Sequence, residues 1–418
     1  MMSDRCLAII GGGPAGLFCA IQAADAGLRI QVFEKNRACA RKLLMSGSGQ
    51  CNITHDGETR AFLTHYGDNG SFLKPALLNF QNHDLVTFFS EHGVQLETEP
   101  GGKIFPVSRK AHDILEVLIR ECSLAGVKIR SEEPVIEVSH ESGRFLIRTG
   151  KDSLYVDAVV IATGGETYPA TGSTGDGFRL ARTLGHQVTG TGPALTSVNV
   201  QNYLFADLSG ISFADLPITL FRDGKKIRTH TGDLLFTHTG LSGPGILDFS
   251  RFIRPGDLLK VSFVPGNDAQ KVNAILVELI AAAGNRQVKT VLGKFDLPER
   301  LIRKLMEIAG IDLELTGPHL SKKDRTSLVD LITACPFVVR SLGGPDEAMA
   351  TRGGVALGEV NPKTMESKFL PGLFFIGEVL DIDGDTGGYN LQAAFSTAML
   401  AAKRIRMIEG QNLSSSSK

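Results

Sequence analysis

Residues 5–35 read RCLAIIGGGPAGLFCAIQAADAGLRIQVFEK: an apolar run, three glycines spaced as Gly-x-Gly-x-x-Gly, a helical pattern and a second apolar run. Gly11 allows a tight turn, Gly13 lets the backbone approach a pyrophosphate, and Gly16 lets the following helix pack closely on a sheet. We expect that helix over residues 14–26, with N–H groups at its start that can bind phosphate. The pattern predicts a strand–turn–helix–strand unit that binds a dinucleotide.

An acidic residue closes the second strand of this unit. The strand expected over Leu28–Phe33 ends at Glu34, eighteen residues after Gly16, where a carboxylate can accept hydrogen bonds from ribose hydroxyls. An acid at this position disfavours a 2′-phosphate. The alternative is a glycine-rich turn that binds nothing. We favour dinucleotide binding because strand, glycines, helix, second strand and acid follow one another in the required order.

Length, charge and cysteine usage narrow the class of protein. The chain has 418 residues, 42% of them hydrophobic, which is enough to bury two or more cores. Its 44 basic and 45 acidic residues nearly cancel, so no global field draws the chain to nucleic acid or to an anionic membrane. The six cysteines include no CxxC pair, which indicates reduced thiols. With no apolar run suited to a signal peptide or a membrane span, we expect a cytoplasmic protein.

Two distant segments bear on the identity of the dinucleotide. Residues 155–186 predict a buried strand, a loop rich in glycine and threonine, and a helix from about Asp176. Residues 370–408 predict a strand, a Gly-Glu turn, a loop that includes Asp381, and a long helix that begins near Tyr389. The N-terminus of such a helix can stabilise the negative charge that a reduced flavin develops.

At these residues the chain resembles the glutathione-reductase-type FAD-binding fold, in which an amino-terminal Gly-x-Gly-x-x-Gly, a central Ala-Thr-Gly and a carboxy-terminal Gly-(Asp/Glu) segment converge on one FAD. Four further motifs are similar to those of the BaiN/YhiN-like flavoproteins, over nearly the whole chain: RKLLMSGSGQCNITH (41–55), GGKIFPVSRKA (101–111), LLFTHTGLSGPGILD (234–248) and GEVLDIDGDTGGYNLQAA (377–394). The resemblance implies a discontinuous, Rossmann-like FAD domain with an inserted domain, tightly bound noncovalent FAD and reductase chemistry.

The sequence supports an insertion independently of the resemblance. Short β-type runs begin after Pro193, and apolar residues recur at helical spacing from Asp268 to Ala334. We therefore expect an α/β protein with four parts. These are an FAD-binding domain in two pieces, 1–193 and 341–410, a β-plus-helical substrate or cap domain at 194–340, and a disordered tail at 411–418.

The chain lacks a second Gly-x-Gly-x-x-Gly after a strand. With no CxxC either, this argues against a disulfide reductase. NADH or NADPH, as the electron donor, would therefore dock transiently over the flavin. The fumarate-reductase-like group is an alternative relative because it shares a Thr-Gly-Asp-Gly motif, present here at Thr174–Gly177, but the sequence identifies no counterpart of its further arginines and histidines.

The segment 41–55 is expected to cradle the flavin, because its two cations can oppose phosphate charge and its Gly-Ser loop lets backbone amides reach the cofactor. A basic surface loop is the alternative. This chain has Gln50 and His55 where the family more often has Arg and Asn. The residues expected to bind cofactor are Gly11, Gly13, Pro14, Ala15, Gly16, Glu34, Lys35, Arg41, Lys42, Ser46, Gly47, Gly49, Val135, Thr163, Gly164, Gly377, Glu378, Asp381, Gly387, Gly388, Tyr389 and Asn390; no metal ligand is expected.

Reduction of an activated C=C bond needs a hydride, a hydrogen-bond donor to the developing enolate oxygen, and a proton. Candidate proton donors are Cys51, His238 and Tyr389. Each has a structural alternative: a small packed residue, a hydrogen-bonding histidine and a stacking ring, respectively. Other charged residues are interpreted as parts of turns: Lys103, Arg109 and Lys110, which are alternative contacts for an anionic substrate, and Asp383 and Asp385.

Three functions remain open. The first is FAD-dependent reduction of a small conjugated ketone, which the BaiN branch suggests. The second is reduction of uridine to dihydrouridine in ribosomal RNA, which the YhiN branch suggests and which requires an extruded base; residues 285–325, with nine Lys/Arg and six Asp/Glu, offer weak support. The third is a noncatalytic flavin-binding redox protein. We expect a small-molecule substrate or ribosomal RNA as partner and no membrane, and the oligomeric state stays open.

Overall fold

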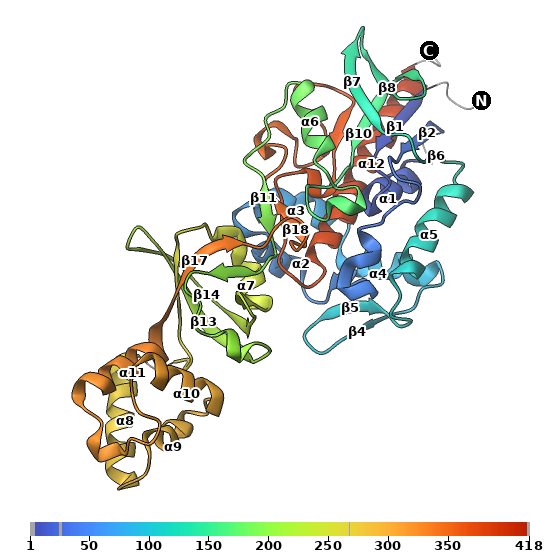
Figure 1. The fold of residues 1–418 in the computed structure, drawn as a ribbon. Coiled ribbons are helices and arrows are strands. Elements are labelled where there is room, and N and C mark those ends of the chain that lie inside the picture. Colours follow the sequence, from blue (N-terminus) through green and yellow to red (C-terminus); the bar gives the residue numbers. More distant parts are fainter. Residues whose placement is uncertain (1–4, 25–26, 267, 416–418) are drawn as a thin grey trace. The chain divides into compact units, whose positions relative to one another are not determined.

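The computed structural model describes residues 5–24, 27–266 and 268–415, and the chain divides into two units (Figure 1). Unit 1 comprises Met1–Ala194 and Pro345–Lys418, and unit 2 comprises Leu195–Gly344. The insertion expected at 194–340 falls on unit 2. Each unit has a hydrophobic core of its own, so each is described separately.

A five-stranded parallel sheet forms the centre of unit 1. Its order is β19-β10-β1-β2-β6, and all four pairings are parallel. Leu7, Val160 and Phe374 are completely buried, as expected for a parallel sheet covered on both faces. The strands are β1 (Cys6–Ile10), β2 (Arg29–Phe33), β6 (Lys128–Arg130), β10 (Ala158–Ile161) and β19 (Leu373–Phe375). The expected α/β class with a Rossmann-like sheet is confirmed.

Helices from both ends of the chain pack against each other beside this sheet, α1 (Pro14–Ala23) in blue and α12 (Tyr389–Ser415) in red (Figure 1). Pro14 starts α1 because its fixed φ suits a first helical turn and its missing N–H is not needed there. Residues 25 and 26 of the expected helix lie outside the described residues. The structure differs from expectation at the other end, where α12 runs into the tail expected to be disordered from 411. Extending an existing helix costs little, and residues 416–418 are not described.

Smaller elements complete unit 1. One antiparallel sheet has the order β3-β5-β4 and another β7-β8-β9. A third pair, β11 (Gly192–Ala194) with β18 (Ala350–Arg352), lies where the chain leaves and re-enters unit 1. The remaining strands are β3 (Thr54–His55), β4 (Leu96–Thr98), β5 (Lys103–Pro106), β7 (Val135–Glu141), β8 (Arg144–Thr149) and β9 (Ser153–Val156). The helices are α2 (Thr59–Phe62), α3 (Gly70–Asn79), α4 (Asn82–Glu91), α5 (Ala111–Leu124) and α6 (Asp176–Thr183).

Unit 2 combines a closed barrel with helices. The barrel order is β12-β15-β14-β13-β16-β17, and α8 to α11 are inserted between β16 and β17. A turn at Asp223 and Gly224 joins the two long strands β13 and β14. The elements are β12 (Val198–Val200), β13 (Ser212–Arg222), β14 (Lys225–Phe236), β15 (Gly240–Ser242), α7 (Pro244–Phe249), β16 (Leu258–Val261), α8 (Ala269–Ala283), α9 (Val288–Leu292), α10 (Glu299–Ile308), α11 (Lys322–Ala334) and β17 (Cys335–Leu342).

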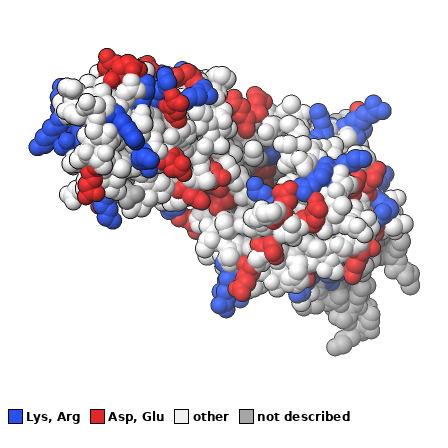
Figure 2. Space-filling view, turned by 90° about the horizontal axis from the view of Figure 1, so that it is seen from below, with Lys and Arg blue, Asp and Glu red and all other residues white. Residues whose placement is uncertain are grey.

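The surface carries side chains of both charges (Figure 2), as the nearly equal numbers of basic and acidic residues predict. Basic and acidic side chains are interspersed over the face shown in Figure 2. Within the described part of the chain, the helices are all too short or too polar to span a bilayer.

Candidate flavin site

Three neighbouring strands bring the glycine motifs together at one edge of the sheet. β1, β10 and β19 are adjacent, and they lead within two residues to Gly11, Thr163 and Gly377. Ligands of open α/β sheets bind at the carboxyl ends of the strands. Gly11 has a φ of +111°, and a Cβ there would lie 2.5 Å from the carbonyl oxygen of Ala162. Only glycine allows the first turn to approach β10 this closely.

The start of α1 offers an open, uncapped helix terminus. Gly13 is the N-cap, and no side chain caps the N–H groups of the first turn. A Cβ on Gly13 would meet no atom within 4 Å, whereas a Cβ on Gly16 would collide with the carbonyl oxygen of Gly11. Gly16 therefore packs the turn against the helix, and Gly13 keeps the space in front of the helix free. Free space, unpaired N–H groups and the helix dipole fit a diphosphate.

Glu34 orders the glycine turn from the end of β2. Its Oε2 accepts a hydrogen bond from the Gly12 N–H at 3.0 Å, and its Oε1 accepts from the Asn36 N–H at 2.8 Å. The residue is only 8% exposed. A carboxylate has further lone pairs, so the arrangement leaves acceptor capacity for a ribose hydroxyl. Lys35 extends elsewhere, and its Nζ lies 2.6 Å from Asp176 Oδ2 at the start of α6.

A charged network joins three distant segments. The Lys42 Nζ donates hydrogen bonds to both carboxylate oxygens of Glu378 at 2.9 Å and to Thr167 Oγ1 at 2.7 Å. The Thr351 N–H donates to Glu378 Oε1 at 2.9 Å. Lys42 and Glu378, expected to face phosphate and sugar hydroxyls, therefore neutralise each other. They fasten the segment after β2 to the segments after β10 and β19.

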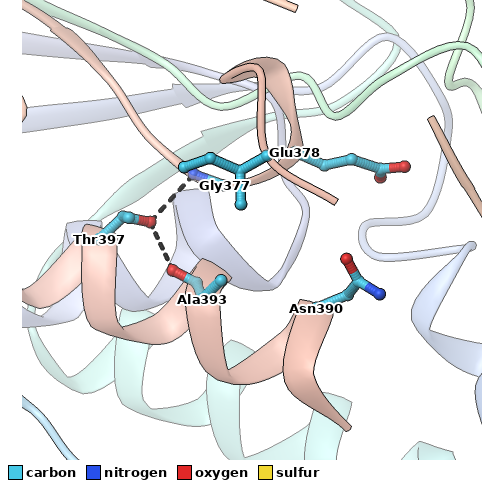
Figure 3. Close-up of a pocket in the computed structure, with 6 residues that line it drawn as sticks. Gly377, Glu378, Asn390, Ala393 and Thr397 are labelled. Carbon is cyan, nitrogen blue, oxygen red and sulfur yellow. Dashed lines mark hydrogen bonds between the residues drawn. The ribbon is translucent and has the colours of Figure 1, made fainter. Parts of the chain in front are cut away.

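A small pocket lies beside this network, between η11 (Gly377–Val379) and the first turns of α12 (Figure 3). The Gly377 N–H donates to Thr397 Oγ1 at 3.0 Å, and that hydroxyl donates to the Ala393 carbonyl at 2.7 Å. Gly377 has a φ of +70°, and a Cβ there would lie 3.1 Å from the Ala15 methyl group. The start of α1 thus borders η11. The lining residues are Gly377, Glu378, Ile382, Asn390, Ala393 and Thr397.

The loop before α12 is held by its own polar groups. Asn390 accepts a hydrogen bond from the Gly384 N–H at 2.8 Å and donates to the Gly384 carbonyl at 2.9 Å. A Cβ on Gly388 would come within 2.6 Å of the Thr54 backbone, so glycine lets this loop contact β3. Burial raises the pKa of Asp381, which interacts with Thr189. Asn390 and Asp381 therefore order the loop in this structure.

The loop expected to cradle the flavin has the backbone freedom that its glycines suggested. Gly47 and Gly49 have φ values of +55° and +88°, and Ser48 also lies in the left-handed region. A Cβ on Gly47 would lie 3.2 Å from the Phe105 ring, so the loop lies against β5. Ser46 accepts a hydrogen bond from the Cys51 N–H through its carbonyl at 2.9 Å.

Other expected cofactor residues have protein partners. Arg41 donates to Asn36 Oδ1 at 3.2 Å, and the Val135 carbonyl accepts from Arg179 at 3.4 Å. Gly164 has a φ of +71°, and a Cβ there would lie 3.7 Å from Glu378 Oε2. These contacts place Gly164 beside the charged network.

The proposed proton donors lie in three different surroundings. Cys51 is fully buried with a φ of +61°, and burial raises the pKa of its thiol to about 12. This environment fits the packing alternative for Cys51, since a thiol of such high pKa is a weak acid. His238 is exposed in the turn between β14 and β15 of unit 2. Tyr389 is 4% exposed at the first residue of α12.

Arg109 has carboxylate partners, as the turn interpretation expects. Its guanidinium lies 2.5 Å from both Glu97 and Glu99, and 4.8 Å from the centre of the Phe105 ring. Lys103 and Lys110 are exposed.

Sequence reasoning missed a histidine and misjudged an aspartate beside Tyr389. The His65 ring stacks on Tyr389 with centroids 4.0 Å apart, and the His55 ring stacks on it at 5.1 Å. Asp385, expected only to shape a turn, has its Oδ2 2.9 Å from His65 Nδ1. No local pattern signals this pair, because 320 residues separate its members.

Comparisons with known proteins agree with this geometry. A family model described as the HI0933-like protein Rossmann domain matches residues 5–404. The chain is 35% identical over 404 residues to a ribosomal RNA dihydrouridine synthase of Haemophilus influenzae, covering 95% of this chain and 97% of that protein. It is 31% identical over 409 residues to a 3-dehydro-bile acid delta(4,6)-reductase of Clostridium scindens, covering 95% and 98%.

Among solved structures, 3-ketosteroid delta1-dehydrogenase from Sterolibacterium denitrificans matches with a TM-score of 0.51 at 12% identity, over 97% of this chain and 100% of that one. At that identity the likeness speaks for the fold alone. The family match covers both pieces of unit 1 and the insertion between them. The chain belongs to the HI0933-like family of FAD-dependent oxidoreductases.

Proposed function

We propose that the protein reduces an activated carbon–carbon double bond in a small conjugated substrate, with NADH or NADPH as the electron donor. The observation that carries the proposal is the meeting of Gly11, Thr163 and Gly377 at the carboxyl ends of three adjacent strands. The relative from Clostridium scindens, whose name describes a delta(4,6)-reductase, supports this reaction type. Bound FAD would supply the hydride-transfer chemistry.

The residues of unit 1 have separate tasks in this proposal. The open N-terminus of α1 at Gly13 binds the diphosphate, and Glu34 accepts a ribose hydroxyl while it orders the turn. Lys42 and Glu378 hold the three segments together next to the pocket of Figure 3. The N-terminus of α12, at Tyr389, contributes a positive dipole end that favours negative charge nearby.

A second candidate is the reduction of uridine in ribosomal RNA. The name of the Haemophilus influenzae relative favours it, and the uracil ring offers an activated C=C to the same hydride chemistry. The charges of the helical part of unit 2 weaken it. Lys289 pairs with Glu314, and Arg303 with Glu299, so carboxylates lie among these cations and the surface is not uniformly basic. We therefore place the small-molecule substrate first.

The test is an anaerobic experiment in two steps. The purified yellow protein is mixed with NADH or NADPH, and loss of the visible flavin absorbance is followed. The reduced protein is then offered a panel of enones and, separately, ribosomal RNA from a strain that lacks the gene. Reoxidation by an enone supports the first candidate, and reoxidation by RNA with formation of dihydrouridine supports the second. A flavin that is never reduced, or that neither acceptor reoxidises, contradicts both.

A further inference from the structure

A histidine and an aspartate from opposite ends of unit 1 form a two-point contact beside α12. His65 ends η3 (Leu63–His65), and Asp385 lies in the loop that leads into α12. The Asp385 N–H donates to the His65 carbonyl at 2.8 Å, and the Asp385 carboxylate lies 2.9 Å from His65 Nδ1. Because the backbone contact fixes the two residues against each other, the carboxylate holds the imidazole ring in one orientation.

The ring is fixed from a second direction by Tyr389. Its centroid lies 4.0 Å from the centroid of Tyr389, and the two planes are inclined by 12°. Tyr389 in turn is held by Tyr66, whose hydroxyl donates to the Tyr389 carbonyl at 2.9 Å. Burial, Tyr389 and Asp385 raise the pKa of Tyr66, so this phenol stays neutral. In the described part of the chain, the ionisable groups that the contacts bring around His65 include Asp385, Tyr389 and Tyr66, together with His55 stacked on Tyr389.

One nitrogen of the imidazole remains available. The His65 side chain is 35% exposed, and among the described residues its Nε2 has no hydrogen-bond partner. A carboxylate that accepts from Nδ1–H leaves Nε2 to accept or, in the imidazolium form, to donate a proton outward. Partial exposure lets water restore that proton. An oriented, solvent-connected imidazole is what a recycling general acid requires.

We propose that His65, oriented by Asp385, is the proton donor of the reductase, an assignment that rests on the function proposed above. Hydride addition to one carbon of the substrate C=C leaves an electron pair on the conjugated partner carbon and oxygen. The His65 Nε2–H bond breaks, its proton forms the second C–H bond, and the imidazolium becomes a neutral imidazole. Asp385 is a positioning residue: it orients the imidazole and gives up no proton to the substrate.

The first experiment separates the two half-reactions in the FAD-loaded protein. His65→Gln is reduced with NAD(P)H and reoxidised either by 2-cyclohexenone, which needs a proton, or by ferricyanide, which needs none. We expect reduction and ferricyanide reoxidation at the wild-type rate, and enone reoxidation slowed about 10²–10⁴-fold with a flatter dependence on pH between 5 and 8. His83→Gln, an exposed histidine of α4 paired with Asp84, is the matched control and should behave as wild type.

The outcomes distinguish this inference from the function it rests on. If the wild type reduces the enone and His65→Gln does so equally fast, the assignment of His65 fails and the reductase stands. If NAD(P)H reduces the wild-type flavin but the reduced flavin passes its hydride to no C=C probe, including uridine-containing RNA, then the proposed function and the assignment of His65 both fail. His65→Asn serves as a second variant should His65→Gln lose its flavin, and wild-type enone reoxidation in His65→Asn likewise overturns the assignment.

A second experiment tests the orientation without turnover. In ¹⁵N-histidine-labelled protein at pH 8, NMR reports which nitrogen of His65 carries the proton. We expect the Nδ1–H form in the wild type, because the carboxylate accepts that hydrogen bond, and a shift toward the Nε2–H form in Asp385→Ala. Identical tautomer populations in the two proteins would remove the positioning role of Asp385.

Discussion

The ammonium of Lys42 lies 2.9 Å from both carboxylate oxygens of Glu378, although 336 residues separate them in the chain. Their side chains are 24% and 20% exposed, so the pair is neither a surface ion pair nor fully desolvated. It links the segment after β2 to the turn after β19. A cofactor that binds at this edge of the sheet therefore lies near an ion pair with no net charge, not near two separate charges.

Removing one partner of this pair should destabilise unit 1. Lys42→Met leaves the Glu378 carboxylate half-buried without its cation, and we expect a loss of about 1–2 kcal/mol in the free energy of unfolding. Urea denaturation at a fixed concentration of free FAD measures it. Arg148→Met, which removes an exposed partner of Glu137, is the control and should change the free energy by less than about 0.5 kcal/mol. Equal effects of the two variants would show that the Lys42 pair is no more than a surface contact.

Two glycine substitutions should separate cofactor binding from folding. Gly13 has open space around its Cβ position and a φ of −79°, so Gly13→Val should still fold, with a loss of about 1 kcal/mol because valine is a poorer N-cap, while its flavin content falls sharply. Gly16→Ala, in contrast, should lower the melting temperature, because its methyl group collides with the Gly11 carbonyl. Flavin stoichiometry and the melting temperature of the FAD-free proteins are the measurements. A yellow, stoichiometric Gly13→Val protein would contradict the diphosphate site.

Cys51 should behave as a packed thiol. Burial raises its pKa to about 12, so in the folded protein it should not react with a thiol reagent at pH 8, whereas urea should expose it. Cys51→Ala should cost about 1 kcal/mol in stability and leave acceptor turnover unchanged. If the enone reoxidises the flavin of Cys51→Ala more slowly while NAD(P)H still reduces it normally, Cys51 is instead a candidate proton donor.

His186 should make the protein less stable in mild acid. Its Nε2 lies 3.0 Å from Ser367 Oγ, it stacks on Phe369, and burial lowers its pKa. The unfolded chain therefore takes up a proton first as the pH falls below about 6.5, so stability decreases from there until the pH passes the lower pKa of the folded state. His186→Gln should lose less stability than the wild type between pH 7 and pH 5. If the free energies of unfolding of the two proteins fall equally between pH 7 and pH 5, His186 is not the cause of the acid sensitivity.

The parts of the fold that local patterns determine were accessible from the sequence. β1, the turn at Gly11, α1 and β2 follow one another within residues 5–35, where periodicity and glycine spacing are sufficient signals. Gly377 and Glu378 were recognisable in the same way, as a turn between a strand and a helix. The closure of the barrel in unit 2 was not accessible, because it depends on β12 pairing with β17, and no local property of either strand specifies that partner.

The contacts of the site were harder to predict than its residues. Lys42 and Glu378 were both identified as site residues, but the sequence could not reveal that each is the partner of the other. Asp385 was interpreted as a turn residue, while its partner His65 lies 320 residues earlier in the chain. Long-range pairing of charged groups is a property of the folded chain, so composition and spacing do not encode it visibly.

The short ladder between β11 and β18 has a consequence for how this architecture can change. Ala194 and Ala350 face each other across it, so the polypeptide departs from the nucleotide-binding half and comes back at practically one point. An exchange of everything between those two alanines would leave every strand of the parallel sheet in place. The insertion can therefore be replaced as a module without rebuilding the parallel sheet.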